Sequence, residues 1–302
     1  MLNAVNSSHV AEVQSLLDSE NGGHTATRRT ALKTALGVGY AATVGAAIAQ
    51  TAIKTPADGL TAGEFVIDVA GAKVRSYRAA PAGKTNLPVI LVVQEIFGVH
   101  EYIADTCRRF AKMGYMAIAT ELFDRQGDPT KYSVMADLVK EVVSKVPDAQ
   151  VMADLDAVVA WAGANGGDAG KLAVTGFCWG GRITWLYAAH NPKVKAGVAW
   201  YGRLVGTPSD ILPKNPVDVV GSINGAVLGL YGGADTGIPQ DTVEKMKVAL
   251  AGGSAAAKKS EFKVYEGMPH AFHADYRPSY RKEAAEEGFA RALAWFKANG
   301  VA

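Results

Sequence analysis

The stretch LAVTGFCWGGRI, residues 172–183, decides the fold. It begins as a short apolar run typical of a buried strand, continues directly into Gly-x-Cys-x-Gly, and leads into a helical pattern. A strand that turns abruptly into a helix strains the backbone at its apex, and only small residues two positions away on each side leave room for the crossing. Gly176 and Gly180 occupy those positions, so the pattern predicts Cys178 as an exposed apex nucleophile.

The chemistry of this position depends on the helix that follows it. The first backbone N–H groups of a helix favour negative charge, so they lower the pKa of a thiol and stabilise an oxyanion. A buried structural cysteine at a glycine-rich turn is the alternative, because thiols often pack as small hydrophobic groups. Cys107 fits that alternative, since it lies in a helical pattern with Ile103 and Phe110. Two cysteines do not form a disulfide framework for a domain of this size.

On both sides of this stretch, apolar runs alternate with helical patterns. The expected strands are Phe65–Val69, Lys73–Tyr77, Leu87–Val93, Met116–Ala119, Leu172–Thr175, Ala196–Trp200, Val227–Tyr231 and Phe262–Tyr265. The expected helices are Tyr102–Lys112, Val134–Val146, Ala149–Gly163, Gly181–His190, Thr242–Leu250 and Ala284–Asn299. The first two strands form a hairpin at Ala70-Gly71. The alternation predicts an α/β fold with a mainly parallel central sheet, helices on both faces, and ligands at the carboxyl ends of the strands.

The composition is that of a folded protein without a strong electric field. The chain has 302 residues, of which 49% are hydrophobic and 20% charged, and this balance excludes a disordered tail, a coiled coil or a collagen-like fibre. The formal net charge is +2, and the basic residues do not form a run. We therefore expect no nucleic-acid partner.

The first fifty residues have the pattern of a targeting segment. Residues 27–33 read TRRTALK, and residues 35–49 are weakly apolar and rich in alanine and glycine. This order resembles a twin-arginine export signal, and the triplet AIA at 47–49 predicts cleavage before Gln50. An alanine-rich helix packed on the domain and a retained membrane anchor are the alternatives.

The resemblance to export signals implies a bacterial protein that folds before it crosses the inner membrane into the periplasm, with the twin-arginine export machinery as a partner. The expected organisation is a leader and signal over residues 1–49, a linker over 50–63 and a single domain over 64–302. We expect no stable membrane span after cleavage, and a monomer or small homo-oligomer.

Two further residues follow strands in the order expected for a catalytic triad. Asp235 ends the sequence GGAD after the strand Val227–Tyr231, and His270 lies in EGMPHAF after the strand Phe262–Tyr265. Nucleophile, acid and histidine thus appear in the chain order of an α/β-hydrolase. His270 would take the thiol proton and later activate water, while Asp235 would orient the imidazole. A helix-capping role for Asp235 and a surface histidine are the alternatives.

With these motifs, the sequence resembles the dienelactone hydrolase family over about Phe65 to Phe296. The marks of the family are QEIFG at 94–98, the elbow at Cys178, Tyr201-Gly202, Asp235, and HAF at 270–272. The resemblance implies an α/β-hydrolase fold and hydrolysis of a small ester or lactone, such as a dienelactone, through a thioester acyl-enzyme. It implies no metal or organic cofactor.

The resemblance also suggests roles for residues around the thiol. Glu95 would accept the S–H hydrogen and suppress the thiolate when no substrate is present, although a helix-capping role is the alternative. The backbone N–H groups of Ile96 and Trp179 are the expected oxyanion hole. Tyr201 is a candidate pocket residue together with Trp200, but aromatic residues at a strand end also serve simply for packing.

Recognition of a substrate carboxylate is the point at which the chain departs from the family. Arg125 matches the first family arginine, whereas Ala274 replaces the second. Arg277 or His273 is a candidate to replace it, because a positive group is needed to pair with a carboxylate. The departure leaves the dienelactone itself uncertain as the natural substrate. The spacing His-x-x-His at 270–273 has no acidic or cysteine cluster beside it, so we expect no metal site.

Two other classes of function remain open at this stage. A noncatalytic binding protein could retain a hydrolase fold, because fold alone does not establish activity. A thiol redox protein would use Cys178 and form a disulfide with Cys107.

Overall fold

The computed structural model describes residues 52–302, so the predicted signal over 1–49 lies outside the described residues. The strands are β1 Leu60–Val69, β2 Ala72–Pro81, β3 Leu87–Val93, β4 Met116–Thr120, β5 Gly167–Phe177, β6 Val194–Trp200, β7 Ala226–Gly232 and β8 Glu261–Tyr265. The α-helices are α2 Glu101–Lys112, α3 Met135–Glu141, α4 Asp148–Ala164, α5 Trp179–His190, α6 Gln240–Ala251 and α7 Lys282–Ala298. Short 3₁₀ turns are Pro129–Lys131, Val143–Lys145, Pro216–Asp218, Val220–Ser222 and Ala257–Lys259.

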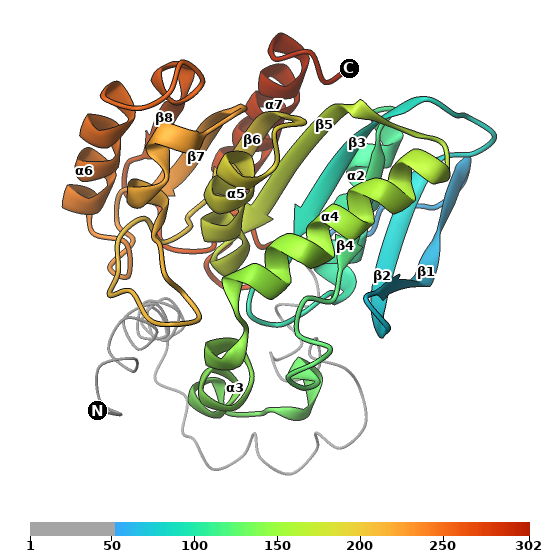
Figure 1. Ribbon diagram of the computed structural model, residues 1–302, viewed down its shortest axis with the longest axis horizontal. Coiled ribbons are helices and arrows are strands. Elements are labelled where there is room, and N and C mark those ends of the chain that lie inside the picture. Colours follow the sequence, from blue (N-terminus) through green and yellow to red (C-terminus); the bar gives the residue numbers. More distant parts are fainter. Residues whose placement is uncertain (1–51) are drawn as a thin grey trace.

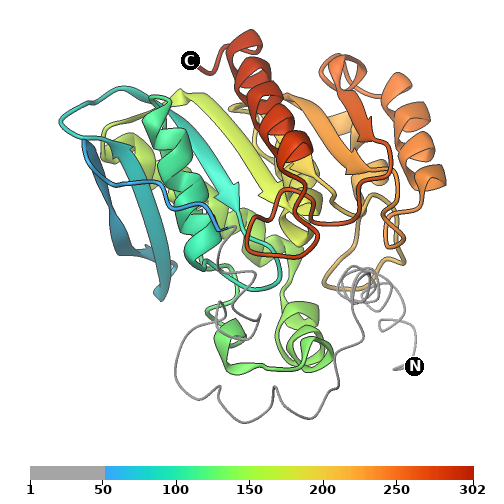
Figure 2. The same cartoon turned by 180° about the vertical axis from the view of Figure 1, so that it is seen from behind.

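The eight strands form one sheet in the order β1-β2-β4-β3-β5-β6-β7-β8. The pairs β1–β2 and β2–β4 are antiparallel, and every other neighbouring pair is parallel. Helices α4 and α5 lie on the face toward the viewer in Figure 1, and α2 and α7 cover the opposite face in Figure 2. The predicted mainly parallel sheet with helices on both faces is confirmed.

The hairpin at the sheet edge is longer than the sequence pattern predicts. Its turn consists of Ala70 and Gly71 with φ of 51° and 87°, and positive φ at both positions matches the right-handed twist of paired strands. The side chain of Asp68 accepts a hydrogen bond from the N–H of Gly71 at 2.8 Å. Strand β1 begins at Leu60, so the sheet starts inside the range expected to be a linker, 50–63.

The predicted helix Val134–Val146 is wrong as a single element. Helix α3 ends at Glu141, the backbone leaves helical geometry at Val142 (φ −122°, ψ −69°), and a 3₁₀ turn follows. Val142, Val143 and Val146 are all buried. Side chains three and four positions apart share one face of a regular helix, so the burial of these valines also fits a helical pattern and does not by itself reveal the break.

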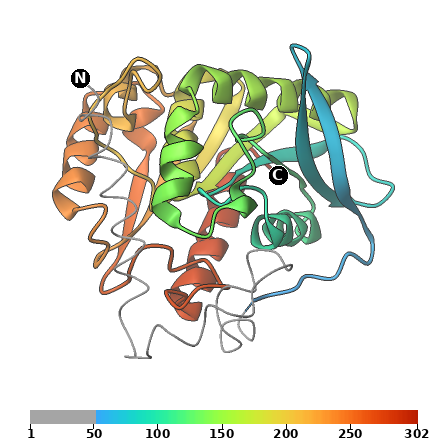
Figure 3. The same ribbon diagram turned by 90° about the horizontal axis from the view of Figure 1, so that it is seen from below.

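The core surrounds the central strands, and their carboxyl ends meet at one edge of the sheet. Every residue of β7 is buried, as are the last five residues of β3 and the last six of β5. Strands buried on both faces need continuous apolar runs, which explains the sequence pattern. Cys107, 0% exposed, packs in this core as predicted. The arrowheads of β3 and β5 point toward α3 in Figure 1, and Figure 3 views the molecule from that side.

Candidate active site

Cys178 occupies a strained turn between β5 and α5. Its backbone has φ 54° and ψ −115°, which side chains rarely adopt. A Cβ atom on Gly176 would overlap the backbone of Gly180, and one on Gly180 would overlap the carbonyl oxygens of Val93 and Gln94. The backbone is therefore too crowded at positions 176 and 180 for any residue other than glycine, as the Gly-x-Cys-x-Gly pattern predicts.

The prediction that the apex thiol is exposed is wrong. Cys178 is 1% exposed, and Trp179 at the start of α5, Tyr201 after β6 and His270 after β8 are buried as well. The turn departs from strand geometry at Cys178, but it does not bring the thiol to the surface. The thiol therefore lies in a site shielded from bulk water, where electrostatic interactions are stronger.

Asp235 and His270 are brought together as the triad requires. Asp235 lies after β7 and His270 after β8, and the Nδ1 of His270 lies 2.6 Å from Oδ2 of Asp235. The other carboxylate oxygen accepts hydrogen bonds from the N–H groups of Gly237 and Ile238. Because the carboxylate only accepts, Nδ1 carries a proton and Nε2 is the acceptor of the neutral ring. Nε2 is buried and has no hydrogen-bond partner among the described residues.

Tyr201 lies between His270 on one side and Cys178 and Glu95 on the other. Its ring centroid lies 5.0 Å from that of His270, and its backbone has φ 39° at the end of β6. Burial raises the pKa of the Tyr201 hydroxyl well above its usual value, and the charges of Glu95 and Cys178 contribute to the shift. The hydroxyl has no hydrogen-bond partner within residues 52–302. Tyr201 thus borders both the imidazole and the thiol side of the site.

Glu95 lies in a hydrogen-bonded cluster whose other members the sequence patterns did not reveal. Oε1 accepts hydrogen bonds from Nε2 of His100, at 2.9 Å, and from the hydroxyl of Tyr276. Oε2 is buried without a hydrogen-bond partner in the described part of the chain. The backbone of Gly180 packs against the end of β3, which places Glu95 next to the elbow. The signal for Tyr276 was weak, because it lies six residues after His270 with no motif of its own.

Several forces act on the ionisation of Glu95. Burial alone would raise its pKa, but the hydrogen bond and charge of His100 and the charge of Arg277 outweigh burial and lower the pKa below its ordinary value. Tyr276 shows the opposite response, since burial and then the charge of Glu95 raise the pKa of its hydroxyl. At neutral pH the cluster therefore contains a carboxylate and a neutral phenol.

Gln94, the first residue of the same motif, has a structural role. Its side-chain amide donates to Oε1 of Glu121 at 2.9 Å, and its carbonyl accepts from the N–H of Leu122 at 3.3 Å. Glu121 also accepts from the N–H of Val99 at 2.8 Å. These bonds tie the turn after β3 to the end of β4. Gln94 thus fixes the loop that carries Glu95 and Ile96.

The candidate oxyanion-hole groups lie at the starts of two turns. Trp179 is the first residue of α5, so its N–H is one of those with no partner inside the helix. Ile96 lies in the turn directly after β3, against which Gly180 packs. Both positions are at the carboxyl edge beside Cys178, as an oxyanion hole requires.

The two candidate arginines differ in their surroundings. Both terminal nitrogens of Arg125 donate to Asp154 of α4, at 2.6 and 2.8 Å, so this guanidinium is already paired with a carboxylate. Arg277 is 4% exposed, stacks over Phe97 at 5.4 Å, and lowers the pKa of Glu95. The structure therefore brings Arg277 into the Glu95 cluster and holds Arg125 against α4.

His273 is a core residue rather than an anion ligand. It is 2% exposed, its ring packs on Trp200 at 4.4 Å and on Phe177 at 5.1 Å, and its Nδ1 shares a hydrogen bond with the hydroxyl of Tyr102 at 2.6 Å. Burial lowers the pKa of His273 well below its usual value. A neutral imidazole offers no charge to a carboxylate, which leaves Arg277 as the remaining candidate.

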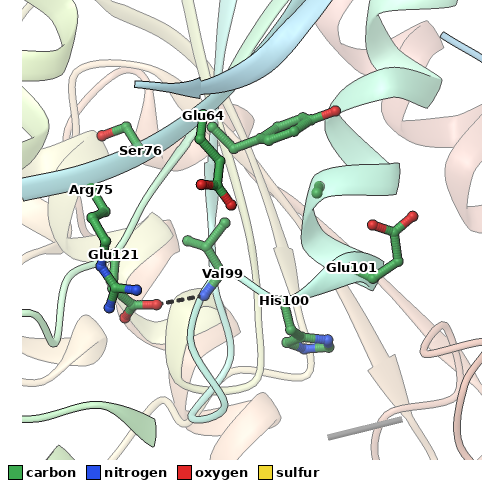
Figure 4. Close-up of a pocket in the computed structure, with 9 residues that line it drawn as sticks. Glu64, Arg75, Ser76, Val99, His100, Glu101 and Glu121 are labelled. Atoms are coloured by element: carbon green, nitrogen blue, oxygen red, sulfur yellow. Dashed lines mark hydrogen bonds between the residues drawn. The ribbon is translucent and has the colours of Figure 1, made fainter. Parts of the chain in front are cut away.

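A cavity of about 160 Å³ adjoins this cluster on the side of the hairpin. Figure 4 shows Glu64, Arg75 and Ser76 on β1 and β2, facing Val99, His100 and Glu101 at the start of α2. His100 lines this cavity and also bonds Glu95, so it lies between the cavity and the buried carboxylate.

Residues 52–302 do not carry the features of three other kinds of site or segment. No group of three or more histidine, cysteine or acidic residues there is arranged to hold a metal ion. No helix in the same range is long and apolar enough to cross a membrane. Neither cysteine of the described chain is in a disulfide.

Comparisons with known proteins agree with this geometry. The sequence profile of the Dienelactone hydrolase family matches residues 74–300. A protein of Methylorubrum extorquens provisionally named carboxymethylenebutenolidase is 58% identical over 279 residues, which is 92% of this chain and 95% of that protein. A protein of Escherichia coli K12 with the same provisional name is 54% identical over 254 residues, covering 84% and 93%.

A solved structure is also similar. The crystal structure of a provisionally assigned dienelactone hydrolase from Klebsiella pneumoniae matches with a TM-score of 0.76 and 57% identity, covering 79% of this chain and 98% of that one. The family match extends over most of the described residues and includes the elbow, the Asp235–His270 pair and Glu95. The chain therefore belongs to the dienelactone hydrolase family, whose members are hydrolases with the α/β-hydrolase fold.

Proposed function

We propose that this protein hydrolyses small esters or lactones through a Cys178–His270–Asp235 triad and a thioester acyl-enzyme. The observation that carries the proposal is the 2.6 Å contact between Asp235 and His270, and the strained elbow at Cys178 supports it. Membership of the family and the provisional names of its relatives support the same reaction class.

Acylation begins with loss of the thiol proton to Nε2 of His270, which is the acceptor nitrogen of the ring. The thiolate attacks the carbonyl carbon, a C–S bond forms, and the carbonyl electrons move onto oxygen. The N–H groups of Ile96 and Trp179 bind that oxyanion. As the intermediate collapses, the C–O bond of the ester breaks and the leaving oxygen takes the proton from His270.

Deacylation repeats these steps with water. His270 takes a proton from water, the hydroxide attacks the thioester carbonyl, and the C–S bond breaks. The thiolate then recovers its proton from the imidazole, so that no electrons are gained or lost overall. Asp235 holds the ring in its reactive tautomer and stabilises the imidazolium. With a lactone, the leaving oxygen remains attached to the acyl group.

Glu95 keeps the resting thiol protonated. A carboxylate beside the sulfur disfavours a second negative charge and accepts the S–H hydrogen bond. The buried Oε2 atom, which has no hydrogen-bond partner among the described residues, is available for that contact. Suppressing the thiolate between turnovers also slows its oxidation to sulfenic acid.

The preferred substrate in this proposal bears a carboxylate that pairs with Arg277. Arg277 is buried in the Glu95 cluster, whereas Arg125 is paired with Asp154. Arg277→Gln should raise the KM for a carboxylate-bearing lactone about tenfold or more, because a charged hydrogen bond in a buried site is lost. The KM for a neutral ester such as p-nitrophenyl acetate should change little. Equal effects on the two substrates would contradict this role.

Cysteine substitution tests the reaction itself. Cys178→Ala should lower the rate of p-nitrophenyl acetate hydrolysis by at least about a thousandfold, because a triad lacking its nucleophile keeps only binding and the oxyanion hole. Mass spectrometry of the parent protein during turnover should detect the acyl group on the Cys178 peptide. Cys107→Ala is the matched control, since that thiol is buried in the core.

The same experiment separates the alternative functions. A noncatalytic protein would show no turnover on any ester, and a variant as fast as the parent would exclude the thiol mechanism. A redox protein would consume peroxide and form a Cys107–Cys178 bond. Burial raises the pKa of Cys107 far above its usual value, which makes it a poor partner for thiol exchange.

We further propose that the protein is exported to the periplasm through the twin-arginine pathway. The arginine pair and the small-residue stretch over 27–49 support this location. Replacing Arg28 and Arg29 with lysine should retain the protein in the cytoplasm. The exported form of the parent should have the mass of residues 50–302, as expected for cleavage before Gln50. Export of the double variant at the parent level would contradict the proposal.

A further inference from the structure

His100 and Glu95 form a pair at the boundary between the site and the cavity. His100 is the N-cap residue of α2, but no side-chain capping bond is formed there. Its Nε2 lies 2.9 Å from Oε1 of Glu95, and because a carboxylate only accepts, Nε2 must carry the proton. The ring packs edge-on against Tyr276 at 5.0 Å and against Phe97 at 6.4 Å. The imidazole is thus fixed in place as a donor.

We propose that His100 is a positioning residue that holds Glu95 as a carboxylate, and thereby keeps Cys178 in the thiol form when no substrate is bound. This inference rests on the proposed function, in which Cys178 is the nucleophile and Glu95 its suppressor. It adds His100 as the residue that keeps Glu95 ionised for this role.

The carboxylate needs such a donor because of its burial. The side chain of Glu95 is 1% exposed, and a buried carboxyl group favours its neutral form unless donors or positive charges compensate. Two side chains of the described residues donate to it, His100 and Tyr276, and both bind Oε1. Loss of the His100 donor would therefore leave Tyr276 as the one remaining donor to this carboxylate among the hydrogen bonds described for residues 52–302.

The binding of both donors to one oxygen also orients the group. With Oε1 held on the side of α2 and the loop before α7, Oε2 is directed away from them. The elbow that carries Cys178 packs against the end of β3, directly before Glu95 in the chain. Oε2 is then the oxygen left to accept the S–H hydrogen in the proposed role, whereas a carboxyl group without the His100 bond would be able to rotate or take up a proton.

Charged and titratable groups surround the pair from every packed element. Those near Glu95 are Cys178 of the elbow, Tyr201 after β6, and Tyr276 and Arg277 before α7. Those near His100 are Glu64 of β1, Arg75 and Tyr77 of β2, Glu121 after β4, and Glu101 and Tyr102 of α2. Arg277 also stabilises the carboxylate, so the test must separate its contribution from that of His100.

The cavity makes side-chain replacement at position 100 practical. The His100 side chain is 13% exposed, and His100 is one of the residues that line the cavity of about 160 Å³. Gln places an amide N–H near the position of Nε2, and Phe keeps the ring without a donor. These two variants differ in the hydrogen bond while both retain a side chain of similar reach.

The experiment measures ionisation of the Cys178 thiol in the absence of substrate. The parent, His100→Phe, His100→Gln and Glu95→Gln are alkylated with iodoacetamide across a pH series, and the Cys178 peptide is followed by mass spectrometry. The midpoint of rate against pH reports the thiol pKa, whereas altered access changes only the plateau. His190→Gln is the matched control, since it removes a histidine–carboxylate pair, with Asp156 at 2.8 Å, outside the site.

We expect the midpoint of His100→Phe to fall by about one pH unit, which is about a tenfold faster reaction below the midpoint. Glu95→Gln should show the same shift, and the double variant should show no further shift. His100→Gln and His190→Gln should stay within about twofold of the parent rate. Turnover of p-nitrophenyl acetate by the parent, measured in parallel, tests the proposed function separately.

Two results would overturn the inference. One is a parent-like midpoint in His100→Phe, which would mean that Tyr276 and Arg277 suffice. The other is a shift in His100→Gln as large as that in His100→Phe, which would assign the effect to the ring rather than to the donor. Should the Phe variant not fold, His100→Leu removes the same donor and takes its place in the comparison. Full turnover by Cys178→Ala would instead refute the proposed function.

Discussion

Gly180 shows how a single missing side chain determines the site. A Cβ atom there would overlap the carbonyl oxygens of Val93 and Gln94, which belong to β3 and the turn after it. The first turn of α5 can therefore approach β3 only with glycine at this position. The same close approach places the Trp179 N–H, the Ile96 turn and Glu95 around Cys178.

Gly180→Ala should destabilise the protein by about 3 kcal/mol or more, because backbone atoms rather than flexible side chains must move. Ester hydrolysis should fall further than the loss of folded protein explains. Gly163→Ala, inside α4, is the control. A Cβ atom at that position would lie 3.9 Å from the Cβ atom of Ala169, which is an ordinary van der Waals contact. That change should leave the free energy of unfolding unchanged or raise it by up to about 1 kcal/mol. Similar melting temperatures for the two variants would contradict the steric account.

At this scale the sequence revealed the residues that belong to a spaced motif. Cys178 was predicted from its flanking glycines, and Asp235 and His270 from their places after strands. His100 and Tyr276 were not predicted as parts of the site, because their roles depend on contacts between distant segments. The burial of Cys178 was also missed, since a local pattern does not show which loops close over a turn.

Helix α2 is held to the segment that precedes β1 by a buried carboxylate. Asp105 is 0% exposed and accepts hydrogen bonds from the N–H of Thr55 at 2.6 Å, from Arg108 at 2.8 Å and from Arg109 at 2.6 Å. Arg109 also donates to Asp275, the neighbour of Tyr276. One side chain thus links the described start of the chain, α2 and the loop that contacts Glu95.

Asp105→Asn should destabilise the fold by about 3 kcal/mol, because removal of one partner from a buried ion pair leaves the other charges uncompensated. Chemical denaturation measures this loss. Asp241→Asn is the control, since Asp241 pairs with Lys245 at 2.8 Å on the exposed face of α6 and exposed pairs contribute little. A denaturation midpoint shared by the two variants would count against the role of Asp105.

Elements were predictable where periodicity alone determines them. The buried strands β3 and β7 were found because strands covered on both faces need continuous apolar runs. The break after α3 was not, because Val142, Val143 and Val146 also fit a helical pattern, and local periodicity does not show where the backbone leaves the helix. The extension of β1 back to Leu60 was missed for a similar reason, since pairing with Pro81 of β2 rather than local composition determines its length.

On the scale of the whole molecule, the sheet gathers side chains that are far apart in sequence. Residues 95, 178, 201, 235 and 270 follow β3, β5, β6, β7 and β8, which are consecutive neighbours in the sheet. Parallel strands bring all of their carboxyl ends to one edge, so the topology accounts for the assembly of the site. This arrangement was predictable from the alternation of strands and helices. The loop closure that buries the site was not, because it depends on tertiary packing.

The buried His273 should make the stability of the whole fold depend on pH. Its pKa is lowered well below 6.5 by burial, so the folded protein keeps the ring neutral while the unfolded chain takes up a proton below pH 6.5. Stability is therefore fully present above pH 6.5 and is lost as the pH falls. The slope from this one residue should approach about 1.4 kcal/mol per pH unit.

His273→Asn should remove this slope between about pH 6.5 and pH 5, because the side-chain amide can donate to or accept from the Tyr102 hydroxyl in place of Nδ1 but does not titrate. The variant will be less stable at pH 7, since the smaller side chain loses contacts with Trp200 and Phe177. Urea denaturation at several pH values separates these effects, because the slope and the offset are independent. His190→Gln, at an exposed position, should keep the parent slope, and a slope that persists in His273→Asn would show that another group is responsible.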